Sequence, residues 1–154
     1  MNKLQSLRDF IESQFEWLQQ NPTALSVFVV DGQFGGTLTA PIALTYAYTA
    51  RLILIDFVGD LREVTAAIEA WIHQHQPDLA QNPARRSLVR FEVEQLANNR
   101  SDVQIDIPLT ESAQFTPREG GGYQVIDVQE ALHEVPYTDA AWQVNIDGDP
   151  IIPG

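Results

Sequence analysis

The chain has no cysteine, one methionine and only nine lysine or arginine residues among its 154. Without cysteine it forms no disulfide and no thiolate metal site, and the absence favours a reducing, cytosolic compartment. No stretch approaches the roughly 20 apolar residues that a membrane span needs. The first residues, MNKLQSLRDFIES, are charged and amphipathic and lack the apolar core of a signal peptide. The sequence therefore predicts neither a membrane span nor an export signal.

Positive charge is scarce, because 21 acidic residues face nine basic ones and the formal net charge is −12. A surface this acidic repels nucleic acid, which is bound mainly through lysine and arginine, and it repels anionic membranes. One interpretation of the charge is solubility. The other is a surface that must lie close to DNA without binding it. Either interpretation predicts no direct nucleic-acid binding.

Two segments carry apolar residues at the three-to-four spacing of an amphipathic helix. The first runs from Lys3 to Gln20 and ends before Asn21-Pro22. The second begins after Gly59-Asp60, with Asp60 and Glu63 as its cap, and ends at Gln76-Pro77.

Short β-branched or alternating segments predict strands at Leu25–Val30, Ile42–Phe57, 89–94, 103–109 and Tyr123–Val128. The second half of Ile42–Phe57 is apolar on both faces, which predicts a place between a helix and another layer. Glycine and proline predict loops at 31–41 and 112–122. Together these segments predict an α+β fold, with two helices packed on one face of a mainly antiparallel sheet in the order α-β-β-α-β-β-β.

We predict a single domain over residues 1–154, with 112–122 as a mobile loop and 131–154 as a C-terminal tail whose structure the sequence does not define. Within that tail Trp142, Val144 and Ile146 alternate like a last short strand.

No segment has the pattern of a catalytic, cofactor or metal site. His73 and His75 lie about 200° apart around a helix and cannot share a metal, and His133 is isolated. Asp147-Gly148-Asp149 lacks the other ligands of a calcium loop. The glycine runs at 35–36 and 120–122 fit no phosphate-binding motif. We therefore predict no catalytic residue, no cofactor and no metal.

Some residues allow two interpretations. Asp56, Asp60 and Glu63 cluster where a strand meets a helix, either as helix caps or as an acid–base pair with pKa values raised by burial. Tyr46 and Tyr48 share one strand face, either as core or as interface anchors. We take Tyr46, Tyr48 and Trp142 as candidate interface residues.

Read whole, residues 1–128 resemble the tail completion protein R family of contractile-tailed temperate phages. The resemblance lies in the order and spacing of short elements: Asn2-Lys3-Leu4 with Leu7, Asn21-Pro22, Tyr46-x-Tyr48-Thr49, Leu52-x-Leu54, Asp56-Phe57, Gly59-Asp60, Trp71, His75-Gln76-Pro77-Asp78-Leu79, Asn82-Pro83, Phe91-Glu92-Val93, Ile105-Asp106, Leu109-Thr110-Glu111 and Gly120-Gly121-Gly122.

The resemblance implies a non-enzymatic structural protein that acts at the head-proximal end of the tail during virion assembly, in a role similar to that of tail terminators. It implies other tail proteins as partners (tube, sheath and head–tail connector) and self-association into a ring. It places the protein in the bacterial cytoplasm during assembly and then in the virion tail. The alternatives are a small acidic enzyme with carboxylates near Asp56 and Asp60, and a small-molecule binding module.

Overall fold

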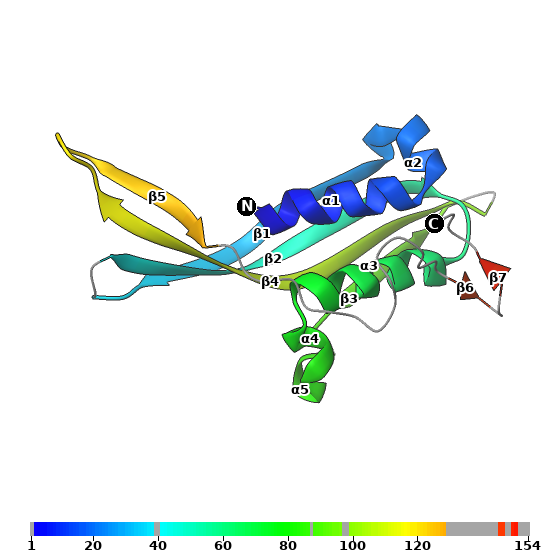
Figure 1. Cartoon of the computed structure of the whole chain (residues 1–154). Coiled ribbons are helices and arrows are strands. Elements are labelled where there is room, and N and C mark those ends of the chain that lie inside the picture. Colours follow the sequence, from blue (N-terminus) through cyan, green and yellow to red (C-terminus); the bar gives the residue numbers. More distant parts are fainter. Residues whose placement is uncertain are drawn as a thin grey trace.

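The computed structural model describes residues 2–38, 41–86, 88–96, 99–128, 145–146 and 149–150. They form a curled antiparallel sheet with helices on one face, which confirms the predicted α+β class (Figure 1). No helix in the described ranges is both long and apolar enough to cross a membrane.

The elements follow the chain as α1 (Asn2–Gln14), α2 (Glu16–Gln20), a 3₁₀ turn (Pro22–Ala24), β1 (Leu25–Gly36), β2 (Ile42–Phe57), α3 (Leu61–His75), α4 (Asp78–Gln81), α5 (Pro83–Arg86), β3 (Arg90–Gln95), β4 (Ser101–Pro117) and β5 (Tyr123–Val128). Two short strands, β6 (Asn145–Ile146) and β7 (Asp149–Pro150), pair with each other.

Strands β2 and β4 form the centre of the sheet, whose order is β1-β2-β4-β3. They pair antiparallel from Ile42 opposite Phe115 to Leu54 opposite Val103. The other edge of β4 is shared, because β3 pairs with its first half and β5 with its last residues. The hairpin of β3 and β4 matches the prediction for 89–94 and 103–109.

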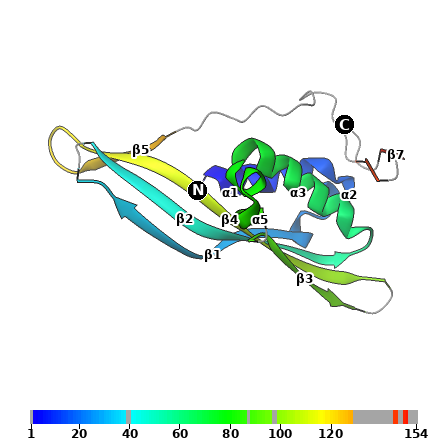
Figure 2. The same cartoon turned by 90° about the horizontal axis from the view of Figure 1, so that it is seen from below.

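The core lies between this sheet and the helices. Alternate residues of β2 and β4 point to the helices, since side chains alternate across a strand, and α1 and α3 cover them in Figure 2. The buried apolar residues of α3 repeat at helical spacing, as the sequence predicts. They are Val64, Ala67, Ile68, Trp71 and Ile72. The Asp60 part of the predicted cap is also present, because its side chain accepts a hydrogen bond from the Arg62 N–H.

The first predicted helix is divided in two. Phe15 has extended backbone dihedrals and separates α1 from α2. Its side chain is only 5% exposed, so the break turns this ring into the core. The apolar periodicity continues across the break, which is why the sequence predicts one helix over Lys3–Gln20.

Both predicted loops are largely strand. Residues 31–36 extend β1 with a bulge at Val30, and 112–117 extend β4 and pair with 123–128. At Gly32 an added Cβ would lie 2.9 Å from Tyr48 Cβ, so glycine lets two strands approach closely. The glycines at 120–122 have positive φ and form the turn between β4 and β5.

One further prediction is wrong for the described residues. The second half of β2 was expected between a helix and another layer, but Ile55 is 44% exposed on the face away from the helices. No helix or strand in the described ranges covers that face (Figure 2). We call it the open face.

Candidate assembly interface

The β1–β2 hairpin and the β4–β5 hairpin reach past the helix layer at the end of the sheet near the N-terminus (Figures 1 and 2). We call this part the sheet extension and define it as residues 31–36 of β1, 42–46 of β2, 112–117 of β4 and 123–128 of β5. By strand register, one face of the extension continues the face that carries α1 and α3. Beyond the helices no described element covers this apolar face.

Two aromatic pairs stand on that face. Phe34 contacts Tyr46 with ring centroids 6.0 Å apart, and Phe115 stacks on Tyr123 with centroids 4.7 Å apart. Phe34 is 75% exposed and Tyr123 is 60% exposed. Exposed aromatic side chains that are already held against a neighbour lose little conformational entropy on contact, which favours their use in an interface.

Glu111 marks where the helix layer ends. Its Oε1 accepts hydrogen bonds from the backbone N–H groups of Asn2 at 2.8 Å and Lys3 at 3.2 Å. A carboxylate at this position satisfies free N–H groups and complements the positive end of the α1 dipole. Asn2 also donates from Nδ2 to Asp127 on β5 at 2.9 Å, so the first residues of α1 join β4 to β5.

A shallow depression of about 230 Å³ lies at this junction. Tyr46, Glu111 and Asp127 contribute to its lining, together with Asn2, Ser112, Ala113 and Val125. It is the place where the apolar face of the extension meets the acidic cap of α1. A partner side chain entering here would meet both an aromatic ring and carboxylates.

The structure separates the two candidate tyrosines. Tyr46 is half-buried and contacts Phe34 on the extension. Tyr48 is 5% exposed, and its hydroxyl donates to Glu111 Oε2 at 2.5 Å. Burial, followed by the hydrogen bond to Glu111 and the charge of that carboxylate, raises the pKa of Tyr48 well above its usual value. The third candidate, Trp142, lies outside the described residues.

A second polar cluster closes the edge of β4 between β3 and β5. Gln76 Oε1 accepts from the Thr110 N–H at 3.1 Å and from Lys3 Nζ at 2.8 Å. Gln76 Nε2 donates to Thr110 Oγ1 at 3.0 Å and to Asp78 Oδ1. This buried glutamine satisfies a backbone group that no strand reaches, so it substitutes for a missing ladder partner.

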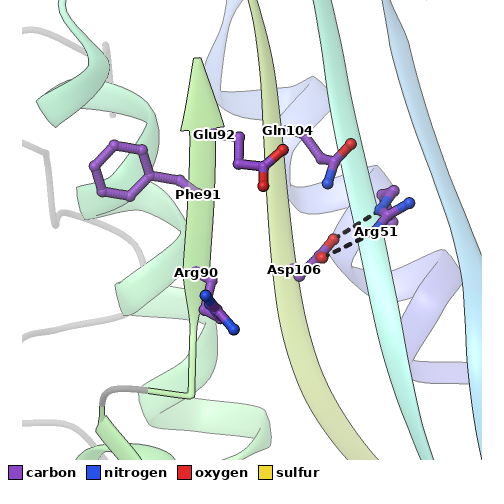
Figure 3. A pocket seen from close by; sticks show the side chains of 6 residues that line it. All are labelled: Arg51, Arg90, Phe91, Glu92, Gln104 and Asp106. Carbon is purple, nitrogen blue, oxygen red and sulfur yellow. Dashed lines mark hydrogen bonds and ion pairs between the residues drawn. The ribbon is translucent and has the colours of Figure 1, made fainter.

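The open face carries a row of charges rather than a deep cleft. Arg51 on β2 makes two hydrogen bonds to Asp106 on β4, at 2.9 and 3.0 Å. Figure 3 shows Arg90 and Glu92 of β3 beside this pair, while the Phe91 ring points away from it. These side chains line a shallow depression of about 210 Å³. Such an open, charged depression has none of the apolar enclosure of a small-molecule site.

The carboxylates considered for catalysis serve the turn between β2 and α3. Hydrogen bonds from Arg62 lower the pKa of Asp60, whereas burial and then the Asp60 charge raise the pKa of Glu63. The Asp56 N–H is held by Asp102 Oδ1 at 3.0 Å. Of the three, Asp60 caps α3, and its carboxylate is already occupied by Arg62.

The two helical histidines have separate partners. His73 Nε2 lies 3.2 Å from Glu69 Oε1, and the His75 ring stacks on Trp71 with centroids 4.6 Å apart. Within the described part of the chain no group of three or more histidine and carboxylate side chains is placed to hold a metal ion.

Sequence reasoning missed Glu111 as a structural centre, although a signal was present. Alternate residues from Val103 to Leu109 are apolar and buried, and the next position in that alternation is Glu111. An acid that continues an apolar row must find donors, and here it finds Tyr48 and the start of α1. Phe34 and Phe115 were missed because their segments were assigned to loops.

Comparison with known proteins gives consistent results over most of the chain. A family model described as P2 phage tail completion protein R (GpR) matches residues 1–132. Tail completion protein R of Escherichia phage P2 is 28% identical over 139 residues, which cover 90% of this chain and 89% of that protein. No solved structure matches.

Proposed function

The chain belongs to the P2 phage tail completion protein R family, and we propose that it performs its structural role in tail completion at the head-proximal end of the tail. It does so by docking the sheet extension onto other tail proteins. Membership of this family implies contact with other tail components and a place in the virion tail. The tube, the sheath and the head–tail connector are the partners that we propose, with assembly taking place in the bacterial cytoplasm.

The observation that carries the proposal is the uncovered apolar surface of the extension, on the side of the sheet that bears the helices. Tyr46 and Phe115 continue the face that elsewhere lies under α1 and α3, yet no described element covers Phe34 or Tyr123. Aromatic residues presented on rigid strands are typical anchors of protein interfaces. Because β4 and β5 are paired through residues 112–117, this surface is formed before a partner arrives.

Two other observations support a structural role without catalysis. The Asp60 carboxylate at the β2–α3 turn is engaged in capping, and the two depressions described above are shallow and lie beside strands. The net charge of −12 supports a protein that meets other proteins and not nucleic acid. Self-association into a ring is part of the proposal, and the unpaired edges of β1 and β3 described below support it.

The experiment is deletion of the gene from an inducible lysogen, with restoration of the unchanged gene as the control. Electron microscopy of the lysate should show tails that fail to join heads, and infectious particles should fall by several orders of magnitude. A gold-labelled antibody on tails from the restored strain should mark the end that receives the head. Normal tails joined to heads in the deletion strain would overturn the role, and label along the whole tail would overturn the position.

A further inference from the structure

Among the described strands of the five-stranded sheet, β1 and β3 are edge strands, and β5, which pairs only with the last part of β4, is a third. The β1 edge starts at Leu25, whose N–H donates to the Pro22 carbonyl and whose carbonyl accepts from Arg8 Nη1 at 2.9 Å. These bonds lead away from β2, so Leu25 directs its backbone groups outward. Because direction alternates along a strand, Val27 and Val29 also direct their N–H and C=O groups to the free edge.

The β3 edge can be assigned in the same way. The Leu96 N–H donates to the Arg100 carbonyl at 2.8 Å beside the turn into β4. Hydrogen-bonded and non-hydrogen-bonded pairs alternate along an antiparallel ladder. Counting back from Leu96 and Arg100, the hydrogen-bonded pairs are therefore Glu94 with Asp102 and Glu92 with Gln104. Phe91 and Val93 therefore direct their backbone groups away from β4 and toward the free edge.

The same residues carry exposed apolar side chains on the same face of the sheet. Phe91 is 59% exposed, Val93 is 46% exposed and Val29 is 40% exposed, and by register all three lie on the face that bears the helices. Edge strands are usually protected by charged side chains, lysine above all, or by proline. Leu25–Val29 carries none of these, and β3 carries charges only at Arg90, Glu92 and Glu94, on the open face.

The strand directions at the two edges also agree. Each neighbouring pair in the order β1-β2-β4-β3 is antiparallel, so β1 and β3 run in opposite directions within one copy. When a second copy is placed in the same orientation beside the first, its β1 lies antiparallel to β3 of the first copy. The contact joins two different surfaces, and a head-to-tail contact of this kind closes into a ring when the rotation between copies allows it.

We propose that β3 of one copy pairs with β1 of the next, with Phe91 opposite Val29 and Val93 opposite Val27. This register places outward backbone groups opposite each other and gathers the exposed apolar side chains on one face. The ring rests on the proposed function, but the pairing itself requires only copies of this chain and no other tail protein. The occupant of both edges is therefore a second copy of this protein.

Charge complementarity favours this register. Arg90 then lies beside Asp31, which follows the bulge at Val30 on the neighbouring β1. In its own copy Arg90 is opposite Asp106, but Arg51 holds that carboxylate in two hydrogen bonds. Within the described ranges neither Arg90 nor Asp31 forms a direct ion pair, and the Asp31 charge acts on Arg51 of its own copy only through space. At the other end, Arg8 occupies the Leu25 carbonyl and limits the pairing.

The test uses the absence of cysteine from the natural chain. In the proposed register Phe28 and Glu92 are opposite each other on the open face, in a pair without mutual hydrogen bonds. Their Cα atoms would be about 4.5 Å apart, a separation that a disulfide can span. Purified Phe28→Cys and Glu92→Cys chains are mixed, oxidised mildly and examined by intact mass spectrometry, which distinguishes the mixed dimer from the two homodimers.

We expect the mixed dimer to exceed each homodimer at least tenfold. The matched control replaces Glu92→Cys by Gln104→Cys, which lies in the same row of the open face but on the central strand β4, and should give no excess. Circular dichroism of each variant verifies folding. Equal amounts of all three dimers, or a Phe28→Cys homodimer that dominates, would overturn the pairing.

Failure of this inference can be told from failure of the proposed function. Tails that are incomplete without the gene, together with no preferred mixed dimer, would reject the edge pairing alone. A strong mixed dimer together with normal tails in the deletion strain would reject the tail role and leave the pairing intact.

Discussion

Tyr48 on β2 and Glu111 on β4 are diagonal neighbours on the same face of the sheet, and the tyrosine hydroxyl donates to Glu111 Oε2 at 2.5 Å. The other oxygen of that carboxylate accepts from the backbone N–H groups of Asn2 and Lys3. One side chain thus fixes a buried tyrosine and the start of α1. This contact positions the boundary between the covered sheet and the sheet extension.

Replacement of Glu111 should weaken the whole domain. Glu111→Ala removes the cap of α1 and leaves the Tyr48 hydroxyl without an acceptor, so we expect a loss of about 2–4 kcal/mol in the free energy of unfolding. Urea denaturation followed by circular dichroism measures it. Glu119→Ala, at the exposed turn between β4 and β5, is the control and should change stability by less than about 0.5 kcal/mol. Equal effects of the two substitutions would show that Glu111 has no special role.

Stability should also fall at alkaline pH because of Tyr48. Its pKa in the folded protein is raised by burial and by Glu111, whereas in the unfolded chain it is near the usual value of about 10. The folded state therefore holds this proton more tightly. The resulting stability is present below pH 10 and is lost as pH rises above it.

The variant for this prediction is Tyr48→Phe. At pH 7 it should cost about 1–2 kcal/mol through the lost hydrogen bond, and above pH 10 its stability should fall less steeply than that of the natural chain. Urea denaturation at pH 7, 9, 10 and 11 gives both slopes. Parallel slopes for the two proteins would contradict the assignment of the alkaline loss to Tyr48.

The glycine at position 32 should be required for close contact between β1 and β2. Gly32→Ala places a Cβ 2.9 Å from Tyr48 Cβ, and we expect a loss of about 1–3 kcal/mol as the strands move apart. Gly35→Ala is a matched control in the same strand, because an added Cβ there meets nothing within 4 Å. Chemical denaturation of the two variants decides the matter, and a Gly32→Ala chain as stable as Gly35→Ala would refute the close approach.

Charge reversal at the sheet edges should weaken and then restore self-association. Arg90→Asp alone should reduce the association constant of purified chains about twofold to fivefold, because an exposed charge pair contributes about 0.5–1 kcal/mol. Combining Arg90→Asp with Asp31→Arg should recover part of the loss. Sedimentation equilibrium measures the constants. Additive losses in the double variant would indicate that the two residues do not meet between copies.

Strong periodicity made most of the fold predictable. The apolar face of Leu61–His75 and the length of Ile42–Phe57 follow from residue type alone, and the structure has both as expected. The sheet extension was harder to predict from the sequence. Gly35 and Gly36, and Pro117 with the glycines after it, are residues typical of turns, yet strand pairing continues through 31–36 and 112–117. Contacts with β2 and β5 outweigh these local preferences, and such contacts lie far apart in the chain.

The candidate interface was predictable only in part. Tyr46 and Tyr48 are equivalent in the sequence, since both have the same strand parity. The end of the helix layer separates them, because α1 begins beside Glu111 and leaves Tyr46 against the exposed Phe34. Where one layer ends above another depends on tertiary packing, which no local pattern of residues records.

We propose that this protein completes tails by docking the apolar face of its sheet extension onto tail proteins. The most direct measurement is complementation of a gene deletion in an inducible lysogen by Phe34→Asp, with Val58→Asp as the matched control. Both residues are apolar and exposed, at 75% and 62%, but Val58 lies in the turn between β2 and α3 outside the extension. We predict that Phe34→Asp accumulates as folded protein yet gives unjoined tails and a loss of infectious particles of at least 100-fold, while Val58→Asp restores them. Normal tails and full titre with Phe34→Asp would contradict the account.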